Sequence, residues 1–366
     1  MVRKKERTKR WTIHQRVFFV LIIIVLVLGT LNTAKAKGWL LPELRGATIS
    51  DKVIRLDSLT LEQKIAQMVI VHGGLWNLQA WKNLQIGGIH EFALERRELY
   101  VDVISQFQRD MVIPFFVTAD LEGCQNPFAL FYDSTSVSDI KTTDEAFLKG
   151  RKDGAYMKNL GFNLNYAPVV DLGDDIWRCR AFLGDEKNVS VLAGSYVKGL
   201  QQEGVLATAK HYPGKTLVIK DPHKNVVAAT IDEKDVYPYT YLSNHDNVSA
   251  VMITHVISSG VVDSQGRPAV VSSEVVAGLR QKFNGLIITD EINMLGLKNF
   301  YKTKDEMYIA VFKAGNDVVL NFNEDPNEVY HMISVVASAV RQGLIPQEQV
   351  DASVRRILIA KGFSVQ

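Results

Sequence analysis

Eight short stretches rich in β-forming residues recur along the chain, each separated from the next by a segment with helical spacing. Most of them are continuous apolar runs, which is typical of parallel strands covered on both faces. Eight strand–helix units over about 320 residues predict an α/β fold, a single (β/α)8 TIM-like barrel. The expected strands span residues 67–72, 87–92, 114–120, 162–168, 206–212, 250–256, 286–291 and 317–322.

Two of the intervening segments carry helix-boundary signals. Thr60 with Gln63 three residues later forms a capping box that opens a helix before the first strand. Pro326 and Gly343 bracket a second helix, because proline is favoured in the first turn and glycine just past the last. The body shows no linker-like segment and no internal repeat, so we expect one barrel domain over residues 37–366, preceded by a leader over residues 1–36.

The leader differs from the body in composition. It holds eight Lys or Arg against one acid, whereas the body holds 34 basic against 39 acidic residues. Residues 17–31 form an uninterrupted apolar run, about 22 Å of helix, which is shorter than the roughly 30 Å core of a bilayer. The leader has a basic start, an apolar core and then Ala34-Lys35-Ala36, an order that is typical of a cleavable signal peptide. An uncleaved signal-anchor accounts for the same hydrophobic leader equally well.

Either form of the leader predicts an exported body close to the membrane. The location is then periplasmic, extracellular, or anchored in the plasma membrane with the barrel outside. The mildly acidic body gives no reason to expect nucleic acid as a partner.

Polar residues gather where the expected strands end. In barrels of this type the carboxyl ends of the strands form one face, and that face carries the active site. Six strand ends with polar residues are better explained by a site than by separate structural roles. The residues are Asp120, Asp171, Lys210, His211, His255, Asp290, Asn321 and Asn323.

Four segments of the body are landmarks of a known family: IPFFVTADLEG, GFNLNYAPVVDL, GLQQEGVLATAKHYPG and GLIITDEINMLG. Together they resemble glycoside hydrolase family 3, in particular its single-barrel β-N-acetylglucosaminidase branch. The resemblance runs from about Ser58 to the C-terminal VDASVRRILIAKG. It implies a retaining hydrolase that removes β-linked N-acetylhexosamine. Together with the export that the leader predicts, it suggests envelope or cell-wall glycans as the source, with a small glycan or muropeptide as substrate. No metal and no organic cofactor are implied.

The resemblance implies three catalytic residues. Asp290 matches the nucleophile of the family turn (S/T)-D-x-(L/I)-x-M, and it closes an apolar strand that can aim a carboxylate into a pocket. His223 and Asp221 match the family's acid/base loop, in which a histidine donates and then accepts a proton while an aspartate orients its ring. Glu291, next to the nucleophile, is expected to point away from the site.

Four substrate-binding residues follow from the same motifs. Asp120 matches the aspartate of D-x-E-G, whose carboxylate accepts hydrogen bonds from sugar hydroxyls. Arg180 matches the arginine of R-S-F, and Lys210 with His211 matches the binding pair.

The chain departs from the family pattern in two places. In D-x-E-G-G-R-V-x-R both arginines are absent, and Gln125 and Phe128 stand in their positions. In the acid/base loop, PGHG is replaced by residues 213–216, PGKT, and Pro222 is added. The first departure puts contacts with the far end of the sugar in doubt, and the second predicts a loop with fewer conformations and slow turnover.

The two cysteines follow the same motifs. Cys124 lies just after the D-x-E-G segment, and Cys179 directly precedes Arg180. In an exported protein they can form a disulfide at a shared barrel mouth; two free thiols are the alternative.

Three other functions remain open. A β-glucosidase or β-xylosidase of the same family fits the altered arginine motif. A catalytically weak glycan-binding homologue fits both departures. A metal-dependent barrel hydrolase would use His211, His255 and Asp290, but the strands carry no H-x-H motif.

Overall fold

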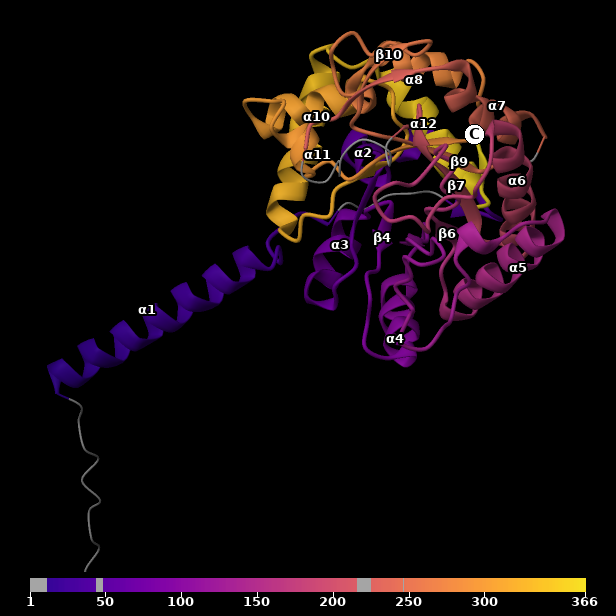
Figure 1. The fold of residues 1–366 in the computed structure, drawn as a ribbon. Helices are drawn as coiled ribbons and strands as arrows, with labels where there is room; N and C mark the ends of the chain where they lie inside the picture. Colours follow the sequence, from indigo (N-terminus) through magenta and orange to yellow (C-terminus); the bar gives the residue numbers. More distant parts are fainter. Residues whose placement is uncertain (1–11, 44–48, 216–224, 246) are drawn as a thin grey trace, which may run out of the picture.

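A computed structural model describes residues 12–43, 49–215, 225–245 and 247–366, and it shows the predicted barrel (Figure 1). Neighbouring strands are all parallel, in the order β11-β9-β7-β6-β5-β4-β3-β12, and a parallel bridge between Ile288 and Val318 closes the circle. The strands are β3 (Val69–His72), β4 (Gly88–His90), β5 (Phe116–Ala119), β6 (Leu164–Asn165), β7 (Leu206–Tyr212), β9 (Ala250–Ile253), β11 (Leu286–Thr289) and β12 (Val319–Leu320).

All eight expected strands are confirmed, and seven are shorter than the apolar runs that predicted them. The residues that drop out lie mainly at the carboxyl ends, where the backbone turns into the loops of the site. Asp120 follows β5 and Asp290 follows β11 in this way. Strand β6 ends before Pro168, which has no amide hydrogen to donate to a neighbouring strand.

Helices surround the barrel and return the chain from each strand to the next. The capping box at Thr60 is confirmed, since its side chain accepts from the Gln63 amide. Pro326 is the first residue of its helix, and Gly343 follows the end of that helix with φ +72°. The helices are α2 (Leu61–Gln67), α3 (Leu78–Leu84), α4 (Arg97–Gln108), α5 (Thr143–Leu160), α6 (Glu186–Gln202), α7 (Glu233–His245), α8 (Ser273–Arg280), α9 (Leu295–Lys298), α10 (Lys304–Lys313), α11 (Pro326–Arg341) and α12 (Gln347–Ala360), with 3-10 turns η1 (Leu56–Ser58), η2 (Leu75–Asn77), η3 (Val137–Asp139) and η4 (Ala269–Val271).

A buried carboxylate holds the last units together at the amino-terminal end of the barrel. Asp317, which precedes β12, accepts from Arg356 at 2.7 Å and from Ser353 at 2.8 Å, both on α12. It also pairs with Arg280 of α8 and accepts from the Ile287 amide of β11 at 2.9 Å. The Asp317 side chain thus links α8, α12 and β11 to the start of β12, where the barrel closes.

Two small sheets lie outside the barrel. Strands β1 (Ile49–Ser50), β2 (Val53–Ile54) and β13 (Ser364–Val365) form one of them beside α2. Strands β8 (Ala228–Ile231) and β10 (Ile257–Gly260) form the other, in the loops that follow β7 and β9. The sheet of β1, β2 and β13 lies on the amino-terminal side of the barrel. The sheet of β8 and β10 lies on the opposite side, where the site is expected.

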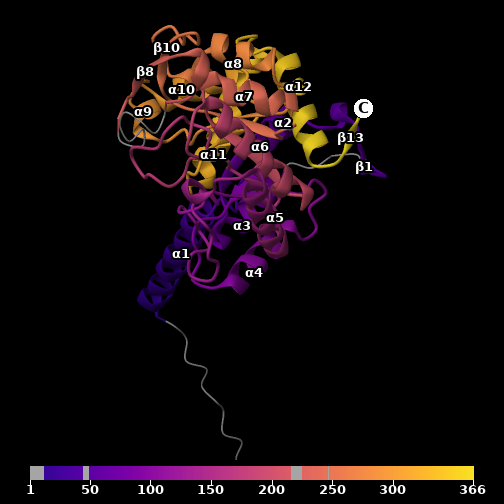
Figure 2. The ribbon, with the colours of Figure 1, turned by 45° about the vertical axis from the view of Figure 1, so that its right-hand side comes forward.

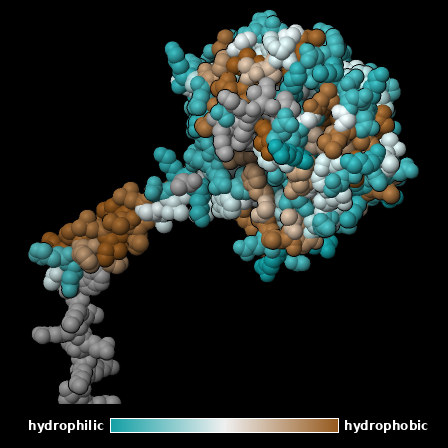
Figure 3. All heavy atoms as spheres, viewed as in Figure 1, coloured by the Kyte–Doolittle hydropathy of each residue, from teal (hydrophilic) through white to brown (hydrophobic). Residues whose placement is uncertain are grey.

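The N-terminal helix α1 (Ile13–Ala36) projects away from the barrel (Figures 1 and 2). Its mean hydropathy is 2.6 and its apolar side chains are exposed, so it forms a hydrophobic rod in Figure 3. Among the described residues it is the one helix long and apolar enough to cross a membrane. Both forms of the expected leader, signal peptide and anchor, are compatible with it.

Candidate active site

A cavity of about 380 Å³ opens at the carboxyl ends of the strands. Its polar wall combines five of the predicted residues with Glu122, Gln125 and Glu291, and its apolar wall is mainly aromatic. The polar lining is Asp120, Glu122, Gln125, Arg180, Lys210, His211, Asp290 and Glu291, and the aromatic lining is Phe92, Tyr166, Trp177 and Phe322. The predicted nucleophile and all four predicted binding residues therefore meet in one cavity.

Four charged side chains form a compact cluster on one wall. Lys210 donates from Nζ to Asp120 Oδ1 at 2.6 Å and also pairs with Glu122. Arg180 approaches the same glutamate, with Nε 2.5 Å from Oε2 and Nη2 3.1 Å from Oε1. Glu122 and Lys210 are almost completely buried, so each charge depends on its partners.

The cluster fixes the charge of its members. Burial alone would raise the pKa of Asp120, but the ammonium of Lys210 holds the pKa of that carboxyl well below its usual range. Burial alone would lower the pKa of Lys210, yet Asp120 and Glu122 hold it above its usual value. The pKa of Arg180 is raised by Glu122 in the same way, against the effect of burial. All these groups stay charged near neutral pH.

Asp290 and Glu291 follow β11 and lie at the floor of the cavity. Asp290 Oδ1 accepts from the Glu291 amide at 2.8 Å, and the Asp290 amide donates to Ile253 of β9 at 2.9 Å. Glu291 contributes to the lining, so it does not simply point away as expected. Its carboxylate is nevertheless occupied, because it accepts from the amide and side chain of Asn293 and from the Phe322 amide.

His211 is held by an aspartate behind the cavity wall. Its Nδ1 lies 2.8 Å from Oδ2 of Asp171, which is buried. Asp171 was one of the strand-end residues in the sequence, and its role is to orient this ring. His255 lies elsewhere, with Nε2 2.8 Å from the carbonyl of Glu291, and it is not part of the lining.

His90 is buried against three aromatic residues of the cavity lining. The His90 ring stacks on Phe322 at 4.6 Å and on Tyr166 at 5.6 Å, and Phe92 meets it edge-on at 4.6 Å. Burial lowers the pKa of His90 to about 4, so the ring is neutral at pH 7. Its Nε2 lies 3.6 Å from Asp120 Oδ2. The sequence contained this residue at the end of an expected strand, GGIHEF, but gave it no role.

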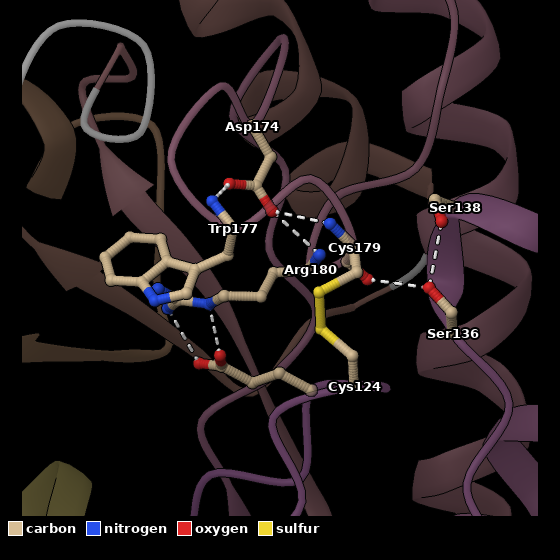
Figure 4. Close-up of a disulfide and its surroundings, with 8 residues drawn as sticks. Cys124, Ser136, Ser138, Asp174, Trp177, Cys179 and Arg180 are labelled. Atoms are coloured by element: carbon tan, nitrogen blue, oxygen red, sulfur yellow. Dashed lines mark hydrogen bonds and ion pairs between the residues drawn. A yellow bond between two sulfur atoms is a disulfide. The ribbon is translucent and has the colours of Figure 1, made fainter.

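The predicted disulfide is confirmed: Cys124 and Cys179 are bonded, with their Cα atoms 5.9 Å apart (Figure 4). It joins the loop after β5 to the loop after β6, directly beside the Glu122–Arg180 pair. Asp174 shapes the second loop, accepting from the amides of Trp177, Cys179 and Arg180 at 2.8 to 3.0 Å. The disulfide and this turn position Arg180 from two sides.

Trp177 is a pocket residue that sequence reasoning missed. Its ring lies 4.5 Å from the Arg180 guanidinium, a cation–π contact, and it forms part of the cavity wall. The sequence offered one signal, a tryptophan three residues before the matched arginine.

The structure explains why a phenylalanine, Phe128, stands at one of the two positions where the family motif has an arginine. Phe128 is completely buried and packs edge-on against Tyr100 at 5.1 Å and Phe162 at 5.3 Å. Its position therefore belongs to the core between the barrel and its helices. Gln125 lines the cavity, so at this position an uncharged side chain stands where the family motif has an arginine.

The predicted acid/base pair, Asp221 and His223, lies outside the described residues. The segment that carries them joins β7 to β8, and Lys215 anchors its start by donating to the Thr230 carbonyl at 2.6 Å and to Asp232 at 3.0 Å.

The donor set for a metal-dependent hydrolase is not assembled. His211 and His255 have separate partners, and within the described part of the chain no three His, Cys, Asp or Glu side chains group as metal ligands.

Comparison with known proteins identifies the family. Residues 60–360 match the family model described as "Glycosyl hydrolase family 3 N terminal domain". The chain belongs to glycosyl hydrolase family 3. Its barrel is the one that the eight strand–helix units predicted.

Two curated relatives and one solved structure illustrate what the chain resembles. A Beta-N-acetylglucosaminidase/beta-glucosidase of Cellulomonas fimi is 27% identical over 76% of this chain and 53% of the relative. Beta-hexosaminidase LpqI of Mycobacterium tuberculosis is 29% identical over 62% of this chain and 61% of the relative. A family 3 glycosyl hydrolase structure from Mycobacterium smegmatis superposes with a TM-score of 0.77, at 28% identity, over 84% of this chain and 98% of that one. The chain thus spans about half to three fifths of the curated relatives it matches.

Proposed function

We propose that this chain is an exported retaining β-N-acetylhexosaminidase with Asp290 as its nucleophile. The observation that supports this most is the place of Asp290 in the cavity: its carboxylate shares the lining with the fixed charges of Asp120, Lys210 and Arg180. A retaining hydrolase needs a carboxylate that can reach the anomeric carbon while other groups hold the sugar hydroxyls. The hexosaminidase names of its relatives support the choice of sugar.

Asp120, Lys210, Arg180 and His211 are the proposed sugar-holding residues. Asp120 Oδ1 accepts from Lys210, whereas Oδ2 stays 3.6 Å from His90 and can accept from a sugar hydroxyl. Lys210 carries further N–H donors for the next hydroxyl. Because the cluster is held before substrate arrives, binding requires little rearrangement of these side chains.

Asp290 opens the reaction by attacking the anomeric carbon as the bond to the leaving oxygen breaks. The acid/base pair rests on the family motif alone. In the proposed mechanism His223 gives its proton to the leaving oxygen, and this first step ends in a covalent intermediate, a glycosyl ester of Asp290. His223 then takes a proton from water, which attacks the same carbon and frees Asp290. Asp221 orients the imidazole and stabilises its cationic form.

We propose that residues 1–36 are the exporting leader and residues 37–366 the catalytic body. The basic start of the leader suits the cytoplasmic side, and the Cys124–Cys179 disulfide suits an oxidising compartment beyond the membrane. The substrate is then an envelope or cell-wall glycan or a muropeptide.

A β-glucosidase is the second candidate. Gln125 lines the cavity where the family motif has an arginine, so contacts with the sugar differ from the family pattern at this point. The printed name of the Cellulomonas fimi relative includes both activities.

Release of 4-nitrophenol from its β-N-acetylglucosaminide and its β-glucoside tests the proposal. The full chain in detergent should turn over the aminosugar, and Asp290→Asn should lower kcat by about 10³-fold or more. Asp144→Asn, an exposed aspartate in the first turn of α5, is the matched control and should retain activity.

Azide rescue distinguishes a nucleophile from a binding carboxylate. In Asp290→Ala, azide should restore 4-nitrophenol release and yield the α-glycosyl azide, because it attacks from the face that the carboxylate leaves. Release from the glucoside alone would select the second candidate. Folded protein without release from either substrate would overturn the enzymatic proposal.

A further inference from the structure

The end of α1 is seated on the barrel by specific contacts. The carbonyl of Lys35 accepts from Asn327 Nδ2 at 2.9 Å. Gly38 has φ +67°, and a Cβ there would lie 2.8 Å from Pro326 Cβ and 3.1 Å from Ala80 Cβ. Only glycine permits this backbone and this approach. The helix therefore joins the body at a fitted junction between α3 and α11.

This junction lies on the same side of the barrel as the cavity. Helix α3 follows β3 and α11 follows β12, so their first turns lie at the carboxyl ends of the strands. Ala80 and Pro326 belong to those first turns. In Figure 2, α1 leaves the body beside α3 and α11, whereas β1, β13 and the C-terminus lie on the other side.

A short line of contacts leads from the cavity to the junction. Phe92 lines the cavity and meets the His72 ring edge-on at 5.0 Å. His72 in turn meets Trp76 at 5.4 Å and bonds to Glu324 at 2.7 Å. Glu324 lies two residues before Pro326, which contacts Gly38. The cavity mouth and the base of α1 are thus adjacent.

Four exposed apolar side chains surround this junction, and we call them the mouth rim: Trp39, Leu40, Leu75 and Trp76. Their exposed fractions are 55%, 63%, 37% and 54%. The five residues 32–36 separate the apolar run of α1 from the body, about 7 Å of helix. That distance places the rim at the depth of the lipid headgroups, where tryptophan is enriched because its ring is apolar and its N–H polar.

We propose that the mouth rim is a membrane-interface surface that holds the cavity mouth at the bilayer, so that the enzyme acts on aminosugar glycans carried by the membrane surface. The substrate class rests on the proposed glycosidase function, whereas the docking of the rim does not. Helix α1 stays attached and spans the bilayer. Trp76 and Leu75 insert among the headgroups beside it, and the barrel takes one orientation.

Quenching of tryptophan fluorescence by brominated lipids tests the orientation without using activity. The full chain is placed in phosphatidylcholine vesicles with bromine at acyl carbons 6 and 7, in a Trp11→Phe, Trp39→Phe background. Three tryptophans remain, and of these Trp81 is completely buried. We expect quenching relative to unbrominated vesicles. Adding Trp76→Phe should remove most of it, because Trp177 is partly buried in the cavity wall.

A tryptophan on the opposite face is the matched control. Leu344 is 46% exposed and follows α11 at the amino-terminal side of the barrel. Leu344→Trp, added to the variant lacking Trp76, should emit without quenching. Equal quenching at Trp76 and at position 344 would mean that the barrel has no fixed orientation on the membrane. No quenching at Trp76 would mean that the mouth rim stays in water. Either result overturns the proposal. An intact mass showing cleavage after Ala36 would do the same.

Discussion

The disulfide offers the sharpest test of how the site is held. Replacing both cysteines, Cys124→Ser with Cys179→Ser, removes a cross-link between residues 55 positions apart. The folded loops keep other supports, because Asp174 still accepts from three amides and Ser136 Oγ still donates to the Cys179 carbonyl at 3.1 Å. The main effect is therefore expected in the unfolded chain, which gains conformational freedom.

The size of that effect follows from the length of the closed loop. Chain entropy for a loop of this length gives a loss of about 4 kcal/mol in the free energy of unfolding. For a body of about 300 residues this corresponds to a fall in Tm of about 6–7 °C. Since Arg180 follows Cys179 directly and pairs with Glu122, we also expect a several-fold rise in KM with a smaller change in kcat.

Differential scanning calorimetry of the wild type and the double variant, each with and without reductant, measures the prediction. Reductant should lower the Tm of the wild type toward that of the variant and leave the variant unchanged. Equal Tm values for wild type and variant would refute the entropic reasoning. A fall in kcat with constant KM would refute the link between the disulfide and substrate binding.

Three further predictions follow. Asp317→Asn should lower the free energy of unfolding in urea by about 3 kcal/mol, because the half-exposed Arg280 and Arg356 lose a buried partner; an unchanged midpoint would contradict this role. Burial raises the pKa of Glu91 from 4.5 to about 8, so the folded state holds this proton more tightly and the stability of the wild type should fall as pH rises through that interval. Glu91→Gln should remove that fall, and parallel profiles of unfolding free energy against pH for the two proteins would disprove it. Trp177→Ala should raise KM for the aminosugar up to about tenfold through loss of stacking surface, and steady-state kinetics with KM unchanged would exclude the ring from the binding wall.

Much of the fold could be predicted because strand and helix signals are local. Apolar runs fixed the eight strands, and the Thr60 capping box and the Pro326–Gly343 bracket fixed helix boundaries. The exact strand ends could not be predicted, since a run such as 114–120 leaves the sheet where Asp120 turns toward the cavity. At that turn Asp120 pairs with Lys210, which lies 90 residues away in the chain.

The five residues that the family motifs matched, Asp120, Arg180, Lys210, His211 and Asp290, line one cavity, and their roles stay predictions. Residues outside the motifs were missed. Trp177 lines the cavity and packs against the Arg180 guanidinium, and His90 is buried against the ring of Phe322, which is far away in the chain. The roles of Asp221 and His223 stay predictions.

The sequence by itself determined the barrel, the strand ends that line the cavity and the hydrophobic leader, because each depends on the order of residues within a short window. The tertiary structure alone decided which partners meet: that Asp171 backs His211, that Glu122 joins Lys210 to Arg180, that Phe128 enters the core and that α1 is seated beside the cavity mouth. These contacts join residues far apart in the chain. Their geometry follows from how the strands close into a circle, which no local pattern records.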